Sequence, residues 1–284
     1  MSGIGVVLNP FSKKYKNDPN HLDRISFIIG DKASCKPTED IDDLRRVADE
    51  FKTRDIDVLA ISGGDGTIHC TLTTFLKVYG EKPLPRICFL RGGTHNTIAA
   101  SLGVLGNTEQ LLSNLLVRYH EDKPFKIRKL RLTKVNNEVG CIFGLGAVYR
   151  FMEVYYRGGT NLSHFTAVLM VMRTLSSMLV NGKTSRELFQ PFDAEVVVNG
   201  KKWPFAQYAA FLTGSVSQIG LGCKVFNSML TRTDCFHAIG MSLKPHDVFS
   251  QIIPMYSGKG SHHPGLLEEP AQHIQIHCAT PQPY

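Results

Sequence analysis

The stretch ISGGDGTIHC, residues 61–70, constrains the fold more than any other part of the chain. Glycine has no Cβ, so Gly63, Gly64 and Gly66 allow the main chain to turn sharply and lie against a ligand. Main-chain N–H groups and a following helix N-terminus would then form an anion site. Asp65 would repel a bare phosphate, so it fits a site in which a divalent metal lies between the two.

This loop joins a strand to a helix, and the pattern recurs at GGTHNT, residues 92–97. Such alternation of strands and helices predicts a mainly parallel sheet covered on both faces, with ligands beyond the carboxyl ends of its strands. We predict strands at 4–9, 24–30, 57–62 and 86–90, and helices at 37–54, 68–79 and 108–120. Thr38 is the predicted cap of the helix 37–54, and its predicted apolar stripe is Ile41, Leu44, Val47, Ala48 and Phe51.

From about residue 125 the pattern changes to hairpins. Asn136-Asn137 and Asn199-Gly200 are turn signals between apolar runs. Further strands are predicted at 236–243 and 272–278, with one helix at about 163–180 among them. The sequence therefore predicts an α/β nucleotide-binding domain with a mainly parallel sheet, residues 1–124, followed by a β-rich, sandwich-like domain, residues 125–284.

Composition limits the partners. The chain has 284 residues, 43% of them hydrophobic, and a net charge of +7. A basic balance suits nucleic acids, acidic membranes or phosphate-rich ligands, although a basic enzyme without such partners has the same balance. No basic motif with interleaved aromatic residues is present, so nucleic-acid binding is not expected. The segment KIRKLRLTK, 126–134, is interpreted as a half-buried strand with a charged outer face.

The chain has the signals of a cytoplasmic protein. Its seven cysteines lack metal-binding spacing and are interpreted as reduced thiols, and its first residues do not resemble a signal peptide. The most apolar stretch, 165–180, is too short to span a membrane and contains Arg173. We expect this stretch to be a core helix, and any membrane contact to be peripheral.

The order of the motifs NP-F-SKK, T-E-D, SGGDGTIH, GGTHNTIA and FGLGAVYR resembles the diacylglycerol kinase catalytic domain family, which includes sphingosine, ceramide and bacterial lipid kinases. GGDGT also occurs in NAD kinases and 6-phosphofructokinases. The upstream Asn-Pro and the downstream Gly-Thr-x-Asn favour the lipid-kinase branch. The resemblance implies an α/β nucleotide-binding domain and a β-sandwich domain, with the active site in the cleft between them.

The resemblance further implies ATP-dependent phosphorylation of a lipid hydroxyl of the diacylglycerol, ceramide or sphingoid type at a membrane surface, with ATP and Mg²⁺ as cofactors. Asp65 would act in catalysis through magnesium on the phosphates. Asp234 matches the aspartate of a structural magnesium site, although Cys235 replaces the family's glycine. FGLGAVYR, 143–150, would form a turn facing the cleft. The ATP site would consist of Asn9, Thr38, Gly63, Gly64, Asp65, Gly66, Thr67, Ile68, His69, Gly93, Thr94 and Asn96.

Several positions depart from the family pattern. His95 and Thr97 replace the third and fifth residues of the usual Gly-Thr-Gly-Asn-Asp, and His69 stands where asparagine is common. The family's general base belongs to a D-G-E-type motif, and the sequence ends at Tyr284 about where that motif would begin. We therefore expect a truncated chain. Glu268 and Glu269 lie upstream of the expected place and are not assigned a role, and the histidines at 262–263 are interpreted as loop residues.

Two other functions remain open. An NAD-kinase-like enzyme would share the glycine loop but should have a downstream Asn-Glu pair, and none is found. A nucleotide- or lipid-binding pseudokinase would explain Thr97 and the missing base. Edge strands of the second domain could also pair two copies into a homodimer.

Overall fold

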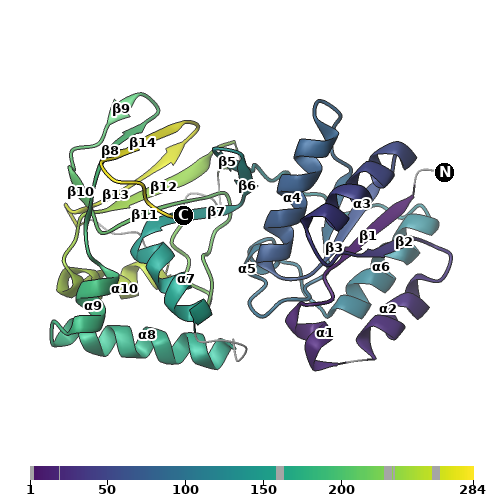
Figure 1. Cartoon of the computed structure of the whole chain (residues 1–284), viewed down its shortest axis with the longest axis horizontal. Coiled ribbons are helices and arrows are strands. Elements are labelled where there is room, and N and C mark those ends of the chain that lie inside the picture. The colour runs from purple at the N-terminus through teal and green to yellow at the C-terminus, as the bar shows by residue number, and fades with distance from the viewer. Residues whose placement is uncertain (1–2, 19, 158–162, 227–231, 233, 258–262) are drawn as a thin grey trace. The chain divides into compact units, whose positions relative to one another are not determined.

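The computed structural model describes residues 3–18, 20–157, 163–226, 232, 234–257 and 263–284. The chain divides into two compact units (Figure 1). The first unit comprises Met1–Arg128 and Asn136–Gly140, and the second comprises Lys129–Val135 and Cys141–Tyr284. The functional division predicted after residue 124 remains a prediction.

A four-stranded parallel sheet forms the centre of the first unit, in the order β2-β1-β3-β4. Every residue of β1 and β3 is buried, as expected for parallel strands covered on both faces. The predicted parallel α/β fold is therefore confirmed. The strands are β1 (Ile4–Leu8), β2 (Ser34–Pro37), β3 (Val58–Ser62) and β4 (Arg86–Phe89).

Helices cover both faces of this sheet (Figure 1). One face packs Ile4, Val6 and Leu8 of β1 against apolar side chains of α2 and α6. On the other face, the rings of Phe51 in α3 and Phe75 in α4 lie 6.4 Å apart. The helices are α1 (Lys13–Asn17), α2 (His21–Ile29), α3 (Ile41–Arg54), α4 (Asp65–Tyr79), α5 (Thr97–Ser101) and α6 (Thr108–His120).

The strand predicted at 24–30 is wrong, because this segment belongs to helix α2. Ile25 and Ile29 are buried four residues apart, whereas Phe27 is 89% exposed. In a strand all three side chains would share one face, but in a helix the first and third share a face without the second. Two apolar neighbours, Phe27 and Ile28, hide this spacing in the sequence, and the true strand β2 is short and polar.

The cap predicted for α3 is also wrong. Asp40, not Thr38, caps this helix, because its side chain accepts a hydrogen bond from the main-chain N–H of Asp43 at 2.8 Å. Thr38 instead extends the sheet edge, with its N–H donating to the Leu8 carbonyl at 2.9 Å. Four residues of the predicted stripe are buried, and Ile41 is 47% exposed.

Two antiparallel sheets form the second unit, which confirms the predicted β-rich fold. One has the order β13-β12-β11-β7, and the other has the order β10-β8-β14 with β9 paired to β8. A core that includes Trp203, Tyr208 and Phe211 fills the space between them. The strands are β7 (Ile142–Gly146), β8 (Phe192–Val198), β9 (Lys201–Lys202), β10 (Gln207–Tyr208), β11 (Ala210–Gly214), β12 (Phe236–Met241), β13 (Leu266–Ala271) and β14 (Ile274–Cys278).

Turn signals predict the hairpins of this region well. Asn199 and Gly200 have φ values of 50° and 82° and join β8 to β9. The strands β5 (Thr133–Val135) and β6 (Glu138–Gly140) flank the other predicted turn. The strand predicted over 126–134 is largely wrong, because its first seven residues have no regular structure and Ile127 is 61% exposed.

The second unit contains more helix than the sequence predicts. Instead of one helix, its described residues form α7 (Ala147–Arg157), α8 (His164–Leu179), α9 (Lys183–Leu188) and α10 (Pro245–Ser257). The segment predicted as a turn at 143–150 is the end of β7 and the start of α7, with Gly146 at a φ of 65° between them. Within the part of the chain that the structure describes, no helix is both long enough and apolar enough to cross a bilayer.

Candidate nucleotide-binding site

The residues predicted to bind ATP follow the carboxyl ends of all four strands of the parallel sheet. Asn9 follows β1, Thr38 follows β2, Gly63 follows β3, and the segment 91–96 comes after β4. The register aligns these ends, because Leu8 lies opposite both Pro37 and Ser62. Ligands of open α/β sheets bind at this edge, so the fold gathers the predicted residues of the first unit in one place.

The two glycine loops lie in direct contact with each other. The Gly92 N–H donates to the Gly63 carbonyl at 2.9 Å. A Cβ on Gly92 would lie 3.0 Å from the Gly63 nitrogen, and one on Gly64 would lie 3.1 Å from the Gly93 Cα. Gly64, Gly92 and Gly93 are therefore needed for packing between the loops, whereas a Cβ on Gly63 would lie 2.4 Å from the Thr67 side chain of its own loop.

Gly66 is different from these four glycines, because a Cβ there would have no atom within 4 Å. It lies in the first turn of α4, which begins at Asp65 directly after its N-cap, Gly64. The helix starts three residues earlier than predicted, so its first N–H groups belong to the loop itself. Those N–H groups have no partner within the helix and can bind an anion.

Asp65 joins the two loops through main-chain hydrogen bonds. Its carboxylate oxygens accept from the N–H groups of Thr97, at 2.9 Å, and Ile98, at 3.0 Å. The carboxylate therefore satisfies two donors at the start of α5. Each oxygen retains a second lone pair, so the same carboxylate can also interact with a cation.

Asparagine side chains hold the loops in shape. Asn9 donates to the Thr67 hydroxyl at 2.9 Å and accepts from the N–H of Phe11 at 2.8 Å. Asn96 has a φ of 51° and bonds both the N–H and the carbonyl of Gly93, each at 2.9 Å. An Asn tolerates this left-handed conformation better than most residues, which explains its place in the second loop.

A surface hollow of about 320 Å³ adjoins the second loop. Its lining comes from α1, from the residue directly after α1, and from the second loop: Lys13, Lys14, Asn17, Asp18, Gly93 and Thr94. The N–H of Lys14 donates to the Gly92 carbonyl at 3.3 Å, so α1 is attached to the loop. Two lysines beside a glycine loop make this hollow suitable for a phosphate group.

Glu109 forms an ion pair with the Lys14 ammonium. The Lys14 Nζ lies 2.6 Å from a Glu109 carboxylate oxygen, and His21 Nδ1 lies 2.9 Å from the other oxygen. Burial raises the pKa of Glu109, but the hydrogen bond and charge of Lys14 outweigh it and lower the pKa to about 2. The sequence could not reveal this cluster, because Lys14 and Glu109 are 95 residues apart.

The remaining ATP-site candidates of the first unit have different surroundings. Ile68 is buried, at 3% exposure, and packs in the core. His69 is half-exposed, and its Nε2 lies 3.2 Å from a carboxylate oxygen of Glu138. Thr94 lines the hollow beside α1.

The predicted metal ligand Asp234 belongs to the second unit and binds Arg232. The guanidinium lies 2.9 Å and 3.3 Å from the two carboxylate oxygens, and this hydrogen bond lowers the pKa of Asp234. Among the described residues, no three His, Cys, Asp or Glu side chains are grouped to hold a metal. Residues 227–231 and 233 of the matching motif lie outside the described residues.

The unassigned glutamates of the second unit have partners in the sandwich. The Trp203 indole N–H donates to Glu269, and Glu268 lies 3.4 Å from His237. His263 accepts from the Gly265 N–H at 3.1 Å, as expected for a loop residue, and His262 lies outside the described residues.

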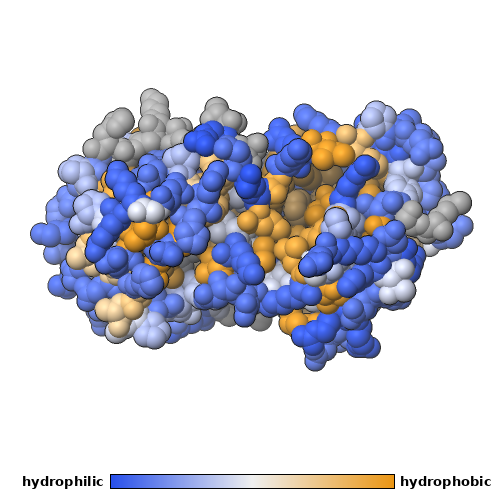
Figure 2. Space-filling model, turned by 90° about the horizontal axis from the view of Figure 1, so that it is seen from above, coloured by the Kyte–Doolittle hydropathy of each residue, from blue (hydrophilic) through white to orange (hydrophobic). Residues whose placement is uncertain are grey.

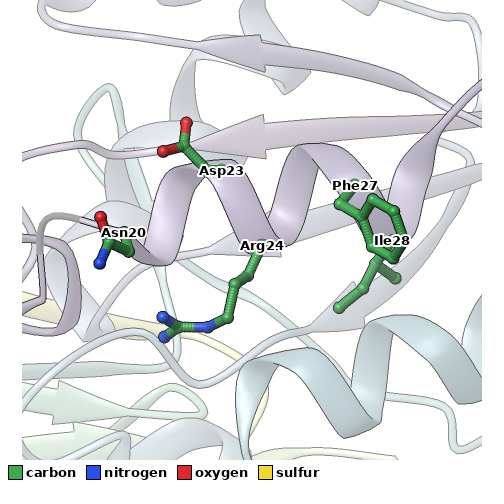
Figure 3. Close-up of a pocket in the computed structure, with 5 residues that line it drawn as sticks. All are labelled: Asn20, Asp23, Arg24, Phe27 and Ile28. Atoms are coloured by element: carbon green, nitrogen blue, oxygen red, sulfur yellow. The ribbon is translucent and has the colours of Figure 1, made fainter.

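A second hollow, of about 450 Å³, lies on the outer side of α2 (Figure 3). Its lining residues are Asn20, Asp23, Arg24, Phe27 and Ile28. None of the predicted site residues lines it, so it is separate from the nucleotide-site candidate.

The residues of the loop region fit magnesium bound together with a nucleotide. Mg²⁺ usually takes one or two carboxylates, and substrate phosphates and water complete its coordination. Asp65 offers such a carboxylate at the start of α4, and a dedicated cage of protein ligands is not required for this kind of binding.

Comparison with known proteins confirms the family resemblance. Residues 4–126 match the diacylglycerol kinase catalytic domain. Among curated proteins, none matches the sequence. The region that matches the family contains both glycine loops and every ATP-site candidate.

Solved structures share the fold of the whole chain. A structure of a candidate diacylglycerol kinase from Bacillus anthracis str. Sterne has a TM-score of 0.69 at 14% sequence identity, and the match covers 98% of this chain and 87% of that chain. A second structure, titled as a diacylglycerol kinase from the same organism, has a TM-score of 0.67 at 14% identity, with coverage of 99% and 88%. At this identity the likeness shows the fold alone.

Proposed function

We propose that this protein is a lipid kinase that transfers the γ-phosphate of ATP to a lipid hydroxyl of the diacylglycerol, ceramide or sphingoid type. The observation that carries the proposal is the contact between two glycine loops at adjacent strand ends, beside a hollow lined by two lysines. The family match over residues 4–126 supports a kinase.

In this proposal the first unit binds the nucleotide. The free N–H groups at the start of α4 and the lysines of the hollow would bind the phosphates, because both present positive charge at the same sheet edge. Gly66 would allow the closest approach to the ligand. Residues 1–124 would form the ATP-binding domain, and residues 125–284 would bind the lipid.

Catalysis would depend on position and charge neutralisation. Bound magnesium would supply positive charge against the phosphate oxygens. Asp65 would position the magnesium, and the same carboxylate also fixes the start of α5. One carboxylate would therefore couple the loop geometry to the position of the phosphates. The lipid hydroxyl needs a general base, and no described residue is assigned to that role.

The proposed reaction takes place in the cytoplasm at a membrane surface. The alternatives are a pseudokinase that binds nucleotide or lipid without transfer, which Thr97 in place of a carboxylate favours, and an NAD-kinase-like enzyme, which the GGDGT loop would also suit.

The test uses radiolabelled ATP, magnesium and mixed micelles of diacylglycerol, ceramide, sphingosine and monoacylglycerol, with products separated by thin-layer chromatography. NAD is tested in a parallel reaction. One labelled lipid is the expected result and would identify the substrate. Labelled NADP would support the NAD-kinase alternative. The same assay is repeated with a chain extended beyond Tyr284 by a relative's sequence. If both chains bind ATP and neither gives a labelled product, the result would support the pseudokinase.

A further inference from the structure

The outer face of α8 is apolar and exposed. Its exposed positions follow helical spacing, at 165, 168, 169, 172, 173, 176, 179 and 180, so they form one continuous stripe. The stripe contains one arginine, one serine and no acidic residue. Its six apolar members are Phe165, Val168, Leu169, Met172, Leu179 and Val180, with exposures from 47% to 77%.

The expectation of a core helix therefore holds for one face of α8 only. Its inner face does pack on the second unit, with Leu175 and Met178 in the core cluster. The outer face is as apolar as the inner one, whereas a surface helix of a water-soluble protein normally has a polar outer face. Sequence periodicity could not separate these cases, because both faces carry apolar residues.

The neighbouring helix α10 has a second exposed apolar stripe. Phe249, Ile253 and Tyr256 share one face at spacings of four and three residues, and Ile253 is 78% exposed. The opposite, strand side of the second unit differs, because mostly hydrophilic residues cover the surface over β8, β9 and β14 (Figures 1 and 2).

Charge supports an anionic partner for the second unit as a whole. Residues 129–135 and 141–284 contain 14 Lys and Arg against 8 Asp and Glu, so nearly all of the chain's net charge of +7 lies in the second unit. Arg173 lies within the apolar stripe of α8 and is exposed.

A second copy of the chain is a poor occupant. In a two-fold interface each Arg173 would be buried against the same stripe of the partner, which offers no carboxylate. At a bilayer surface, by contrast, apolar side chains enter the acyl region while an arginine extends to the lipid phosphates.

We propose that the outer face of α8, together with that of α10, docks on an anionic lipid bilayer. The helix lies in the plane of the interface, with its inner face kept on the second unit. Only the purpose of this docking rests on the proposed function: it would bring the lipid-binding unit to a substrate held in the membrane. The surface itself is defined by exposure and charge alone.

The test measures flotation of the full chain with vesicles of phosphatidylcholine, with and without 30% phosphatidylglycerol, in the absence of nucleotide. The α8 variant is Leu169→Gln with Met172→Gln. The matched control is Phe27→Gln with Leu105→Gln, which removes two exposed apolar side chains, at 89% and 81% exposure, from the first unit. Thermal unfolding of each variant shows that it is folded.

We expect the wild-type chain and the control to bind anionic vesicles, and the α8 variant to bind at least about tenfold more weakly, because each lost apolar side chain gives up burial in the bilayer. Arg173→Gln should reduce the preference for phosphatidylglycerol. Hydrogen exchange of wild-type α8 should slow when vesicles are added, and this readout needs no variant.

Three results would overturn the proposal. In the first, the wild-type chain does not float with vesicles. In the second, the α8 variant floats as well as the control. In the third, the wild-type chain is a dimer and the α8 variant is a monomer. A chain that phosphorylates a soluble short-chain lipid but does not bind vesicles would remove the docking surface and keep the kinase. A chain that floats with vesicles but phosphorylates nothing would keep the docking surface and reject the kinase.

Discussion

The glycines of the two loops have separate tasks. Gly93 faces the Gly64 backbone so closely that a Cβ there would overlap the Gly64 Cα, whereas Gly66 faces open space. The motif GGDGT therefore combines Gly64, which allows the two loops to meet, with Gly66, which leaves open space at the start of α4. This distinction leads to opposite expectations for the same substitution at Gly93 and at Gly66.

We predict that Gly93→Ala destabilises the protein by about 1–3 kcal/mol, because an added methyl group must push the two backbones apart. Gly66→Ala should stabilise the fold by about 0.4–1 kcal/mol, because alanine suits a helical position, and it should weaken ATP binding. Urea unfolding and nucleotide titration of both variants measure the two effects. If the two variants were equally stable, or if Gly66→Ala bound ATP with full affinity, the separate roles of Gly93 and Gly66 would be contradicted.

His237 gives the second unit a pH dependence. Its side chain is 2% exposed, and burial lowers its pKa from 6.5 to about 4. Between these values the unfolded chain binds a proton that the folded chain does not, so stability falls as the pH drops from about 6.5 towards 4.

We predict that this loss of stability is visible in the fluorescence of Trp203, the only tryptophan of the chain, which lies in the same unit. Urea unfolding at several pH values measures it. His237→Gln cannot titrate, so its stability should depend less on pH across this window, whatever its absolute value. An unchanged pH slope in the variant would show that His237 is not responsible.

At the scale of elements, the assignment of residues 24–30 to a helix can be tested by energetics. Ile25→Ala should cost about 2–5 kcal/mol, because Ile25 is fully buried between the sheet and α6. Phe27→Ala should change the free energy of unfolding by no more than about 0.5 kcal/mol, because Phe27 is exposed. Chemical denaturation measures both, and similar costs at the two positions would indicate a strand.

The same element shows what the sequence can and cannot predict. Glycine and asparagine turns, the parallel strands β1, β3 and β4 and the long helices α3, α4, α6 and α8 follow from local patterns, and the structure confirms them. Helix α2 and the short polar strand β2 do not follow from local patterns, because packing in the folded unit overrides local preference. The local pattern does not predict the helices α7, α9 and α10 either.

The site shows a similar limit. The sequence indicates the two glycine loops and their place at strand ends, but not the cluster of Lys14, His21 and Glu109, whose members meet only in the folded unit. Nor does it indicate that Asp65 bonds the start of α5 or that Arg232 binds Asp234. Contacts between distant segments depend on tertiary structure, and no local spacing encodes them.

At the scale of the whole molecule, we propose that the first unit binds the nucleotide and that the second unit approaches the lipid. The first assignment rests on loop contacts and charge at one sheet edge, and the second on two exposed apolar stripes and most of the net charge. The first assignment depends most directly on Asp65, because its carboxylate accepts main-chain hydrogen bonds at the start of α5 and can also interact with a cation.

The central measurement is therefore phosphate transfer from radiolabelled ATP to lipid by Asp65→Asn. Its control is Asn107→Ala, which removes the cap of α6. This substitution should cost about 0.5–2 kcal/mol of stability. The cost is similar to that expected when Asp65→Asn disturbs the hydrogen bonds to the α5 amides. We predict that Asp65→Asn stays folded and loses transfer, while Asn107→Ala loses stability and keeps transfer. Full activity in a folded Asp65→Asn protein would contradict the proposed mechanism.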